Sequence, residues 1–274
     1  MELATSLQFA GQNWAADLSK GTSLAIPLDF ENPQPNCFRT PPARREPWDS
    51  GDGFVGSTQK GGSCNVDFVQ LIPHCNGSHT ESIAHITNES IWISEIAPSG
   101  LLLGQIASVT PALWKESGES YSELAQPEDS VITASSLRGV LQQGVQALIL
   151  RTLPNVSAKR SRDWSSPPAA PYLTLDAVRL LVELGVNHLL LDVPSLDRSE
   201  DGGQLLAHHE FWHVAPLSRV AGPSSRRSAT ISEMIFVPDR LKDGIYLLSL
   251  QVAAWQTDAA PCNPIVYPLH PLSK

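Results

Sequence analysis

The sequence predicts an α/β protein, because two continuous apolar segments flank a segment with the signals of a helix. Residues 145–151 and 186–193 each contain an uninterrupted apolar run, Ala147–Leu150 and Leu189–Leu191, as expected of strands buried on both faces of a sheet. Between them, Thr174 is placed to cap a helix that runs to Leu184, and Gly185 is placed to end it. A strand, a helix and a second strand in this order indicate the α/β class.

The N-terminal part is less regular. Residues 23–28 and 65–72 each predict a strand, while residues 32–63, with five prolines and several glycines, predict a long ordered loop. Trp48, Phe54 and Phe38 lie on this loop. They are expected either to pin the loop to the body of the protein or to form an aromatic wall of a substrate pocket, with Trp48 and Phe54 as substrate-binding candidates.

Four further segments complete the predicted order. Residues 100–109 predict a buried strand, and residues 135–143 a helix that Gly144 ends. Residues 245–252 predict a late strand. The polar inserts at 156–168 and 216–227 are typical of surface loops. We therefore expect one domain over residues 1–274, with an N-terminal loop region at about 30–63.

Composition and charge exclude several classes of function. The formal net charge is −9 and the basic pairs Arg44-Arg45 and Arg226-Arg227 are isolated, so a nucleic-acid partner is not expected. No run approaches the roughly 18–20 apolar residues of a membrane span, and the N-terminus lacks the features of a secretory signal. The four cysteines form no C-x-x-C pair, which favours reduced thiols in a cytoplasmic protein.

Six of the eight histidines fall into two clusters, three between His74 and His85 and three between His208 and His213. Imidazole and carboxylate are the usual ligands of zinc, manganese and iron. His79 and Glu81 are two residues apart, so both point to one side of an extended backbone. Gly77 permits a sharp turn that brings His74 toward His79. This spacing predicts a divalent-metal site.

Several motifs together resemble the cyclase family of metal-dependent hydrolases, which includes kynurenine formamidases and isatin hydrolases. Gly77-Ser-His79-Thr-Glu81 followed by His85 resembles the family signature H-x-G-T-H-x-D-x-x-x-H. The resemblance extends, in the family's order, over about residues 14–268. Its other motifs are Asp17-Leu-Ser19, Leu191-Asp-Val-Pro-Ser-Leu-Asp197, Leu206-Ala-His208, Ile231-Ser-Glu233, Asp243-Gly-Ile-Tyr and Asp258-Ala-Ala-Pro-Cys-Asn-Pro-Ile.

The resemblance implies a mixed sheet forming a partial barrel with flanking helices, a swivelling β/β/α-like fold, and a homodimer. It implies one or two divalent ions, zinc or manganese. His74, His79 and Glu81 would hold one ion, and Glu81 would bridge to a second ion. The second ion would also be held by His208, for which His209 competes, and by Glu233. His85 would be the general acid and base.

The implied reaction is hydrolysis of a C–N bond in a small amide by metal-activated water. The substrate would be an aryl formamide such as N-formylkynurenine, or a cyclic amide such as isatin. Three alternatives stay open: a lactone or ester hydrolase on the same site, a non-catalytic protein that binds metal or a small molecule, and a cysteine hydrolase using Cys75. Trp212 is a further aromatic candidate, which is expected to pack beneath His208.

Overall fold

The two apolar runs form neighbouring strands in a computed structural model, which describes residues 4–272. Strand β10 (Ala147–Thr152) pairs in parallel with β12 (His188–Leu191). Helix α4 (Leu175–Glu183) lies in the connection between them, and Oγ1 of its N-cap Thr174 accepts a hydrogen bond of 3.0 Å from the Ala177 amide. Gly185 follows the helix at a φ of 78°, which favours glycine. The predicted strand–helix–strand unit is confirmed.

Alternate residues of these strands belong to two different cores, which explains the apolar runs at residues 147–150 and 189–191. Leu148, Leu150 and Leu189 pack in the larger core with the helices. Ile149 and Leu190 pack in the smaller core with side chains from the other strands. A strand that is covered on both faces has no solvent side on which polar residues would be favoured.

The main sheet contains a closed ring of seven strands, so the predicted barrel is confirmed. Strands β7, β10, β12 and β13 are parallel, and their neighbours β14, β15 and β6 are antiparallel. The ring closes because β6 pairs with both β13 and β15. The bounds not yet given are β6 (His79–Glu81), β7 (Leu101–Val109), β13 (Thr230–Glu233), β14 (Gly244–Val252) and β15 (Ala259–Pro271).

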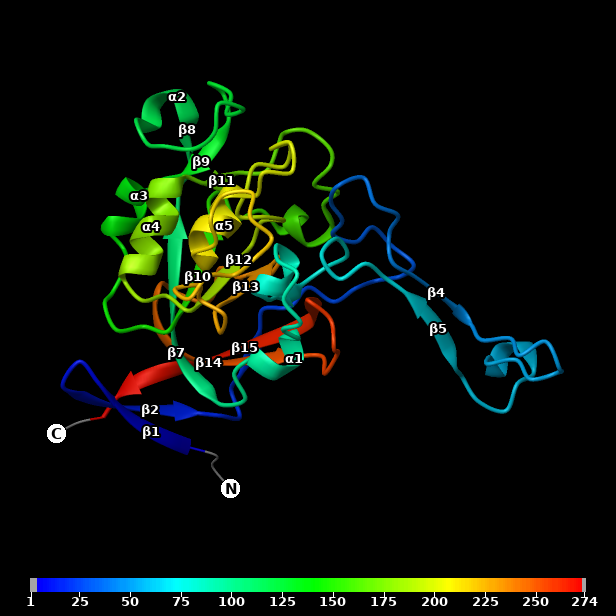
Figure 1. Ribbon diagram of the computed structural model, residues 1–274. Helices are drawn as coiled ribbons and strands as arrows, with labels where there is room; N and C mark the ends of the chain where they lie inside the picture. The colour runs from blue at the N-terminus through cyan, green and yellow to red at the C-terminus, as the bar shows by residue number, and fades with distance from the viewer. Residues whose placement is uncertain (1–3, 273–274) are drawn as a thin grey trace.

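Helix α4 packs between α3 (Ala134–Arg138) and α5 (Leu206–Trp212), and all three lie on one side of the sheet (Figure 1). The prediction of a helix over 135–143 was too long, because α3 ends at Arg138 and is followed by Gly139. The shorter elements are α1 (Ile93–Ile96), α2 (Trp114–Ser117), β8 (Ala112–Leu113), β9 (Ser130–Ile132), β11 (Tyr172–Leu173) and the 3₁₀ turns Thr58–Lys60, Ile83–His85 and Ser157–Ser161.

The N-terminal strands extend the sheet beyond the ring. Strands β1 (Ala4–Phe9) and β2 (Gln12–Asp17) form a hairpin on the end of β15. The predicted strand at residues 23–28 is reduced to β3 (Thr22–Ser23), which also pairs with β15. Leu24, which follows β3, is buried in the smaller core but does not belong to a strand. Its burial explains why the apolar pattern predicted a longer strand.

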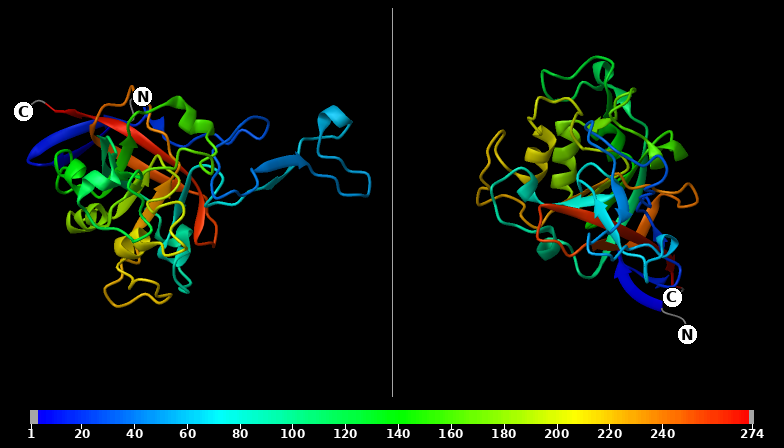
Figure 2. Two further views of the ribbon diagram at one scale, coloured as in Figure 1. Left: turned by 90° about the horizontal axis from the view of Figure 1, so that it is seen from above. Right: turned by 90° about the vertical axis from the view of Figure 1, so that its right-hand side faces the viewer.

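A two-stranded ribbon projects from the body of the protein (Figures 1 and 2). It pairs β4 (Arg44–Pro47) with β5 (Asp67–Gln70), and we call residues 44–70 the arm. The predicted loop at 32–63 therefore contains a strand, and the strand predicted at 65–72 lies in the arm, outside the barrel. Within residues 4–272, no helix has the length and apolar character needed to cross a membrane.

Candidate metal centre

Strand β6 carries His79 and Glu81 into the wall of the barrel. Its antiparallel register with β13 puts Glu233 opposite His79, and its register with β15 puts Ala259 opposite Glu81. His79 and Glu81 alternate with Thr80, so their side chains share one side of the strand, as the sequence predicts. All three residues of β6 are fully buried although none is apolar. The sheet thus holds polar groups where ordinary packing would favour hydrocarbon.

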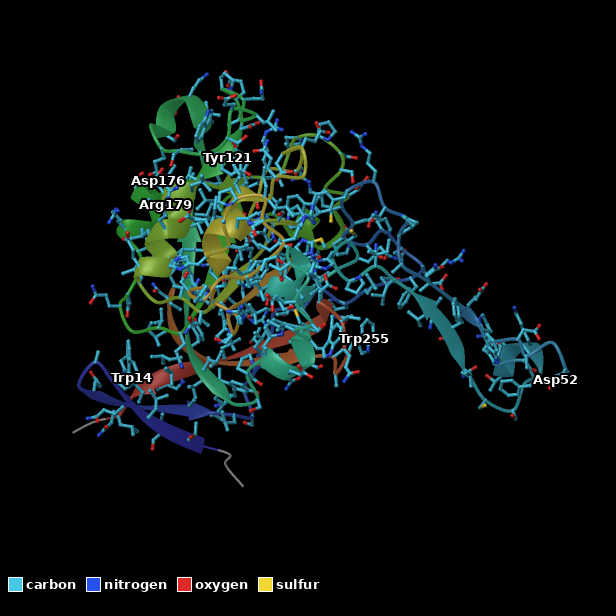
Figure 3. The ribbon with its side chains drawn as sticks, in the orientation of Figure 1. Trp14, Asp52, Tyr121, Asp176, Arg179 and Trp255 are labelled. Atoms are coloured by element: carbon cyan, nitrogen blue, oxygen red, sulfur yellow. The ribbon has the colours of Figure 1, made fainter. Side chains whose placement is uncertain are left out.

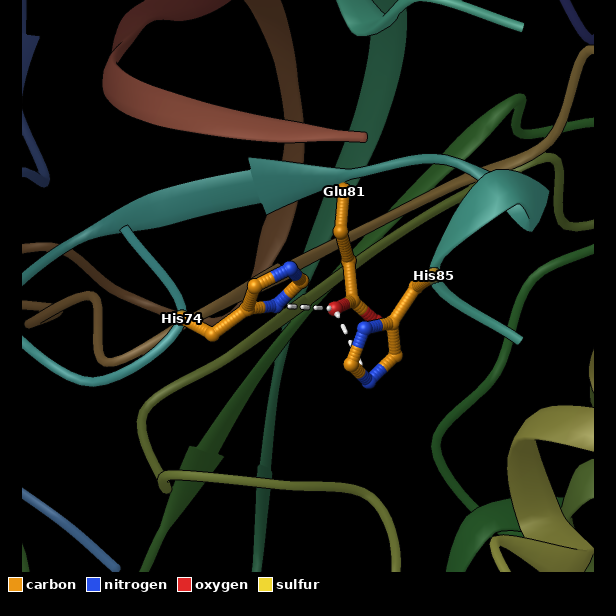
Figure 4. Close-up of side chains that lie close together, drawn as sticks. All are labelled: His74, Glu81 and His85. Atoms are coloured by element: carbon orange, nitrogen blue, oxygen red, sulfur yellow. Dashed lines mark ion pairs between the residues drawn. The ribbon is translucent and has the colours of Figure 1, made fainter. Parts of the chain in front are cut away.

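His74 folds back onto this strand through a turn at Gly77, whose φ is 82°. The ring of His74 lies 5.5 Å from that of His79, centroid to centroid, and stacks on the ring of His85 at 4.1 Å. Figure 4 shows His74 and His85 on either side of the Glu81 carboxylate. The turn and the 3₁₀ segment after β6 therefore bring both histidines to the same carboxylate.

Glu81 is the central group of the site, and both of its oxygens face imidazole nitrogens. Oε2 lies 2.9 Å from Nδ1 of His74 and 3.9 Å from Nε2 of His85. Oε1 lies 3.0 Å from Nε2 of His208, which α5 brings from 127 residues away. Glu233 adds a second carboxylate, with Oε2 at 3.4 Å from Nε2 of His79 and Oε1 at 4.0 Å from Nε2 of His208.

Three of the imidazoles are oriented by a partner on their outer nitrogen. Nδ1 of His208 lies 2.6 Å from Asp197, and Nε2 of His74 lies 2.7 Å from Asp258. Nδ1 of His79 lies 3.0 Å from the Gly77 carbonyl. Such partners fix the ring and the tautomer of a histidine that binds metal through its other nitrogen. In each case the remaining nitrogen faces Glu81 or Glu233.

Two atoms at the centre of the site are buried without a hydrogen bond from any described residue. They are Nε2 of His79 and Oε2 of Glu81; the latter lies 2.9 Å from Nδ1 of His74, but the two groups are not aligned for a hydrogen bond. Leaving buried polar atoms unsatisfied costs about 1–3 kcal/mol each. A divalent cation bound between an imidazole nitrogen and a carboxylate oxygen would satisfy both atoms, so the donor set fits a metal ion.

Among the described residues, two groups have donor atoms close enough together to hold an ion. The first contains His74, Glu81 and His85, and the second contains His79, Glu81 and Glu233. Glu81 belongs to both groups, consistent with the bridging position expected of it. The pairing differs from the expected one, since His79 is grouped with Glu233 and not with His74. His85, expected to act on protons, also lies within reach of an ion.

The charges of the site balance one another. Burial raises the pKa of a carboxyl group, but at Glu81 the positive charges of His85 and His208 and the hydrogen bond from His208 hold the pKa well below its ordinary value. Burial lowers the pKa of His74, yet the hydrogen bond with Asp258 and the nearby Glu81 carboxylate raise it to about 10. The pKa of His208 is likewise raised well above its ordinary value, by the charge of Glu81 and the hydrogen bonds with Asp197 and Glu81, against the effect of burial.

The structure places His208, and not His209, beside Glu81. His209 lies on α5 with its Nδ1 buried and unpaired among the described residues. Residues 209–213 read H-E-x-x-H, a pattern that binds zinc when both histidines share a helical face. Here the helix ends at Trp212, His213 adopts a φ of 53°, and Glu210 pairs with Arg179 at 3.2 Å. This second pattern therefore lacks the geometry of a metal site.

The aromatic candidates are not brought to the histidines of their own chain. Trp48 follows β4 and Phe54 lies in the turn closed by the bridge between Asp49 and Val55, so both belong to the arm. Figure 3 marks the outer end of the arm with Asp52. Trp212 is fully buried beneath His208, with its ring 5.6 Å away, and packs there as expected.

Sequence reasoning missed the orienting groups. Asp197 and Asp258 lie in motifs that carry the family resemblance, so their positions were visible but their contacts with His208 and His74 were not. Asp258 also lies 3.6 Å from Nδ1 of His85. No sequence pattern indicated the role of the Gly77 carbonyl, because every residue has a backbone carbonyl.

A barrel with a buried cluster of imidazoles and carboxylates is typical of a class of hydrolytic enzymes. Comparison with similar proteins shows the family to which the chain belongs. Residues 17–198 match the family described as "Putative cyclase". The chain is 30% identical over 214 residues to kynurenine formamidase from Bacillus anthracis, covering 78% of this chain and 85% of that protein. It is 29% identical over 214 residues, with the same coverage, to kynurenine formamidase from Bacillus cereus.

Solved structures share the fold at low sequence identity. An isatin hydrolase bound to the product analogue thioisatinate has a TM-score of 0.56 at 14% identity, over 92% of this chain and 93% of that chain. A predicted metal-dependent hydrolase from Bacillus stearothermophilus has a TM-score of 0.57 at 14% identity, over 90% and 98%. The chain belongs to the cyclase family, and it is an amidohydrolase-type enzyme.

Proposed function

We propose that this enzyme hydrolyses the C–N bond of a small amide, either an aryl formamide such as N-formylkynurenine or a cyclic amide such as isatin. The observation that carries the proposal is the buried pair of unsatisfied atoms on His79 and Glu81, within a set of imidazole and carboxylate donors. The activities of the kynurenine formamidases and isatin hydrolases, which are similar to this chain, support the substrate class.

The proposed roles follow from the positions of the side chains. His74, His79, Glu81, His208 and Glu233 would hold one or two divalent ions, zinc or manganese. Such an ion lowers the pKa of water toward about 7 and polarises a carbonyl group. His85 is partly exposed at the edge of the cluster, and would pass a proton to the leaving nitrogen. Asp258 and Asp197 would hold His85, His74 and His208 in their orientations.

The central test removes the two unsatisfied atoms. His79→Ala and Glu81→Ala are each expected to lose bound metal and hydrolytic activity, while His270→Ala, which removes an exposed imidazole from β15, should lose neither. Metal content is measured on protein purified without added metal. Metal content that survives both changes would show that the ion is bound elsewhere.

A substrate panel separates the candidate reactions. Formyl-anilides, isatin-like lactams and lactones are compared at saturating metal, together with the Cys75→Ser variant. Turnover of an amide with full activity in Cys75→Ser supports the proposed mechanism over thiol chemistry. Turnover of lactones alone would identify an ester-cleaving relative. Stoichiometric metal without turnover of any substrate would instead indicate a binding protein.

We further propose a homodimer in which the arm contacts the second copy, in a cytoplasmic setting supported by four free cysteines. An isolated two-stranded ribbon is only marginally stable in water. This one exposes Trp48, Phe68 and Val69, with 48% of Trp48 accessible. The arm points away from its own barrel (Figure 2), so Trp48 and Phe54 would meet the partner.

The test of the dimer changes the exposed aromatic residues of the arm. Trp48→Ser combined with Phe68→Ser should convert the dimer to a monomer, as measured by light scattering during size-exclusion chromatography. Trp255→Ser, which removes an exposed tryptophan from the body, is the control (Figure 3). A wild-type chain that is monomeric at high concentration would contradict the proposal.

A further inference from the structure

A cavity of about 510 Å³ lies beside the metal centre, and none of the centre's imidazoles or carboxylates lines it. Its walls come from Asp129 and from three segments that are distant in sequence, at residues 37–39, 164–172 and 194–200. The volume is in the range of small-molecule sites. The cavity is therefore not explained by the proposed hydrolytic reaction.

The wall is preformed, because hydrogen bonds join two of its segments. The Asn36 amide donates to the Arg162 carbonyl at 3.1 Å, and the Trp164 amide donates to the Asn36 carbonyl at 2.7 Å. The Arg39 amide donates to Oγ of Ser165 at 2.7 Å. A cavity whose rim is held in this way loses little entropy when a ligand binds.

The rim contains two neighbouring residues in a strained backbone conformation. Phe38 and Arg39 have φ values of 55° and 56°, a region that side chains larger than those of Gly, Asn and Asp rarely adopt. The strain holds the Phe38 ring at the mouth of the cavity with 47% of the residue exposed. Strained, exposed aromatic residues at a cavity mouth indicate a binding role.

Three of the fifteen residues that line the cavity are aromatic. Trp164 and Tyr172 are buried, and with Phe38 they supply one ring from the rim and two from the interior. The guanidinium of Arg162 stacks on the Trp164 ring at 4.2 Å, which fixes that ring and adds positive charge nearby. These rings favour a flat aromatic ligand.

Arg198 supplies a donor for an anion. Its Nε donates to Asp129 at 2.8 Å, and its Nη1 donates to the Glu200 carbonyl. Its Nη2 makes no hydrogen bond within residues 4–272. Two carboxylates also line the cavity, and both are paired: Asp129 with Arg198 and the Tyr172 hydroxyl, the latter at 3.1 Å, and Glu200 with Arg39 at 3.3 Å. The open side of the guanidinium is suited to a carboxylate.

We propose that this cavity binds a small planar aromatic carboxylate, with the ring among Phe38, Trp164 and Tyr172 and the carboxylate on Arg198. The cavity and the metal centre touch through one residue, because Cys37 on the wall contacts the His74 carbonyl at 3.6 Å. The two sites nevertheless use different side chains. Binding in the cavity therefore does not require metal.

Benzoate is the probe, and cyclohexanecarboxylate and benzamide are the comparison ligands. Binding is measured on metal-free protein by following chemical shifts in NMR spectra. Benzoate should bind wild-type and His79→Ala protein within twofold of one another. Both comparators should bind at least tenfold more weakly, since one lacks the flat ring and the other lacks the charge.

Two variants alter the cavity. Arg198→Lys keeps the charge beside Asp129 but loses the forked donor, and Phe38→Ala removes an exposed ring whose loss leaves the fold intact. Each should weaken benzoate binding about tenfold or more, whereas Arg240→Lys, a surface control, should have no effect. If Arg198→Lys does not fold, Phe38→Ala decides. Three results would each overturn the proposal. The first is no benzoate binding at concentrations up to roughly 10 mM. The others are unchanged binding in the folded variants and loss of binding in His79→Ala.

Discussion

Asp258 connects the two histidines at the open side of the metal centre. It lies 2.7 Å from Nε2 of His74 and 3.6 Å from Nδ1 of His85, while Glu81 occupies the inner side of both rings. The hydrogen bond with His74 and the nearby His85 imidazole hold the pKa of Asp258 well below its ordinary value, so it is ionised throughout the neutral range. A carboxylate in this position orients both rings without itself entering the buried cluster.

Asp258→Asn is expected to lower kcat by about 10–100-fold at saturating metal, because His85 loses the charged partner that fixes its ring. KM should change much less. The measurement is steady-state kinetics on the amide substrate, with metal content determined in parallel and Asp52→Asn at the outer end of the arm as the control. A kcat within twofold of the wild-type value would show that Asp258 has no orienting role.

How far the residues of the site could be predicted depends on the distance over which they interact. His79 and Glu81 share a side because strand geometry acts over two residues, and this was predicted from spacing alone. The position of Glu233 opposite His79 depends on the register between two strands, which no local pattern encodes. The contact of Asp258 with His74 joins residues 184 apart, so no local pattern encodes it either.

At the scale of elements, strands with strong apolar runs were predicted and strands without them were not. The runs in β7, β10, β12 and β14 reflect burial on both faces. β6 is a three-residue strand of polar side chains, and β15 contains four prolines at 261, 264, 268 and 271, so neither has the usual signal. Both strands exist because their neighbours pair with them.

Strand β12 also holds a histidine whose burial makes stability depend on pH. His188 is buried, with Nδ1 2.9 Å from the Thr230 hydroxyl of β13. Burial and the nearby Arg226 charge lower its pKa to about 4. Because the folded pKa lies below the unfolded value near 6.5, this contribution to stability is complete above about pH 6.5 and is lost as the pH falls toward 4.

Below pH 4, His188 is expected to lower the unfolding free energy by about 3 kcal/mol, because each unit of pKa shift contributes about 1.36 kcal/mol. His188→Gln removes the titrating group, so the unfolding free energy of the variant should fall less between pH 7 and pH 4.5 than that of the wild-type protein. Urea unfolding at the two pH values measures this difference. Equal losses in both proteins would assign the acid sensitivity to other groups.

At the scale of the whole molecule, the metal centre joins three parts of the chain. Its donors come from the segment at residues 74–85, from α5 and from β13, and the ring of strands brings these parts together. An ion that binds only the assembled site stabilises the folded chain by RT ln(1 + [M]/Kd), or about 2.7 kcal/mol at one hundred times Kd. The barrel and the ion are therefore expected to stabilise each other.

Removal of metal by a chelator should lower Tm, and restoring zinc or manganese should raise it with increasing ion concentration. Differential scanning fluorimetry of the wild-type protein and Glu81→Ala tests this expectation. The variant should show no dependence on the ion. The same dependence in both proteins would place the stabilising ion outside the cluster around Glu81.

The closure of the ring by β15 has a consequence for the order in which a newly made chain acquires its ion. Residues 259–261 form one of the two edges that hold β6 in place. The histidines at 74–85 leave the ribosome long before that edge exists, so a nascent chain carries the ligands without the geometry that selects among metals. We therefore expect discrimination between ions to be exercised by the finished barrel, after translation has passed β15.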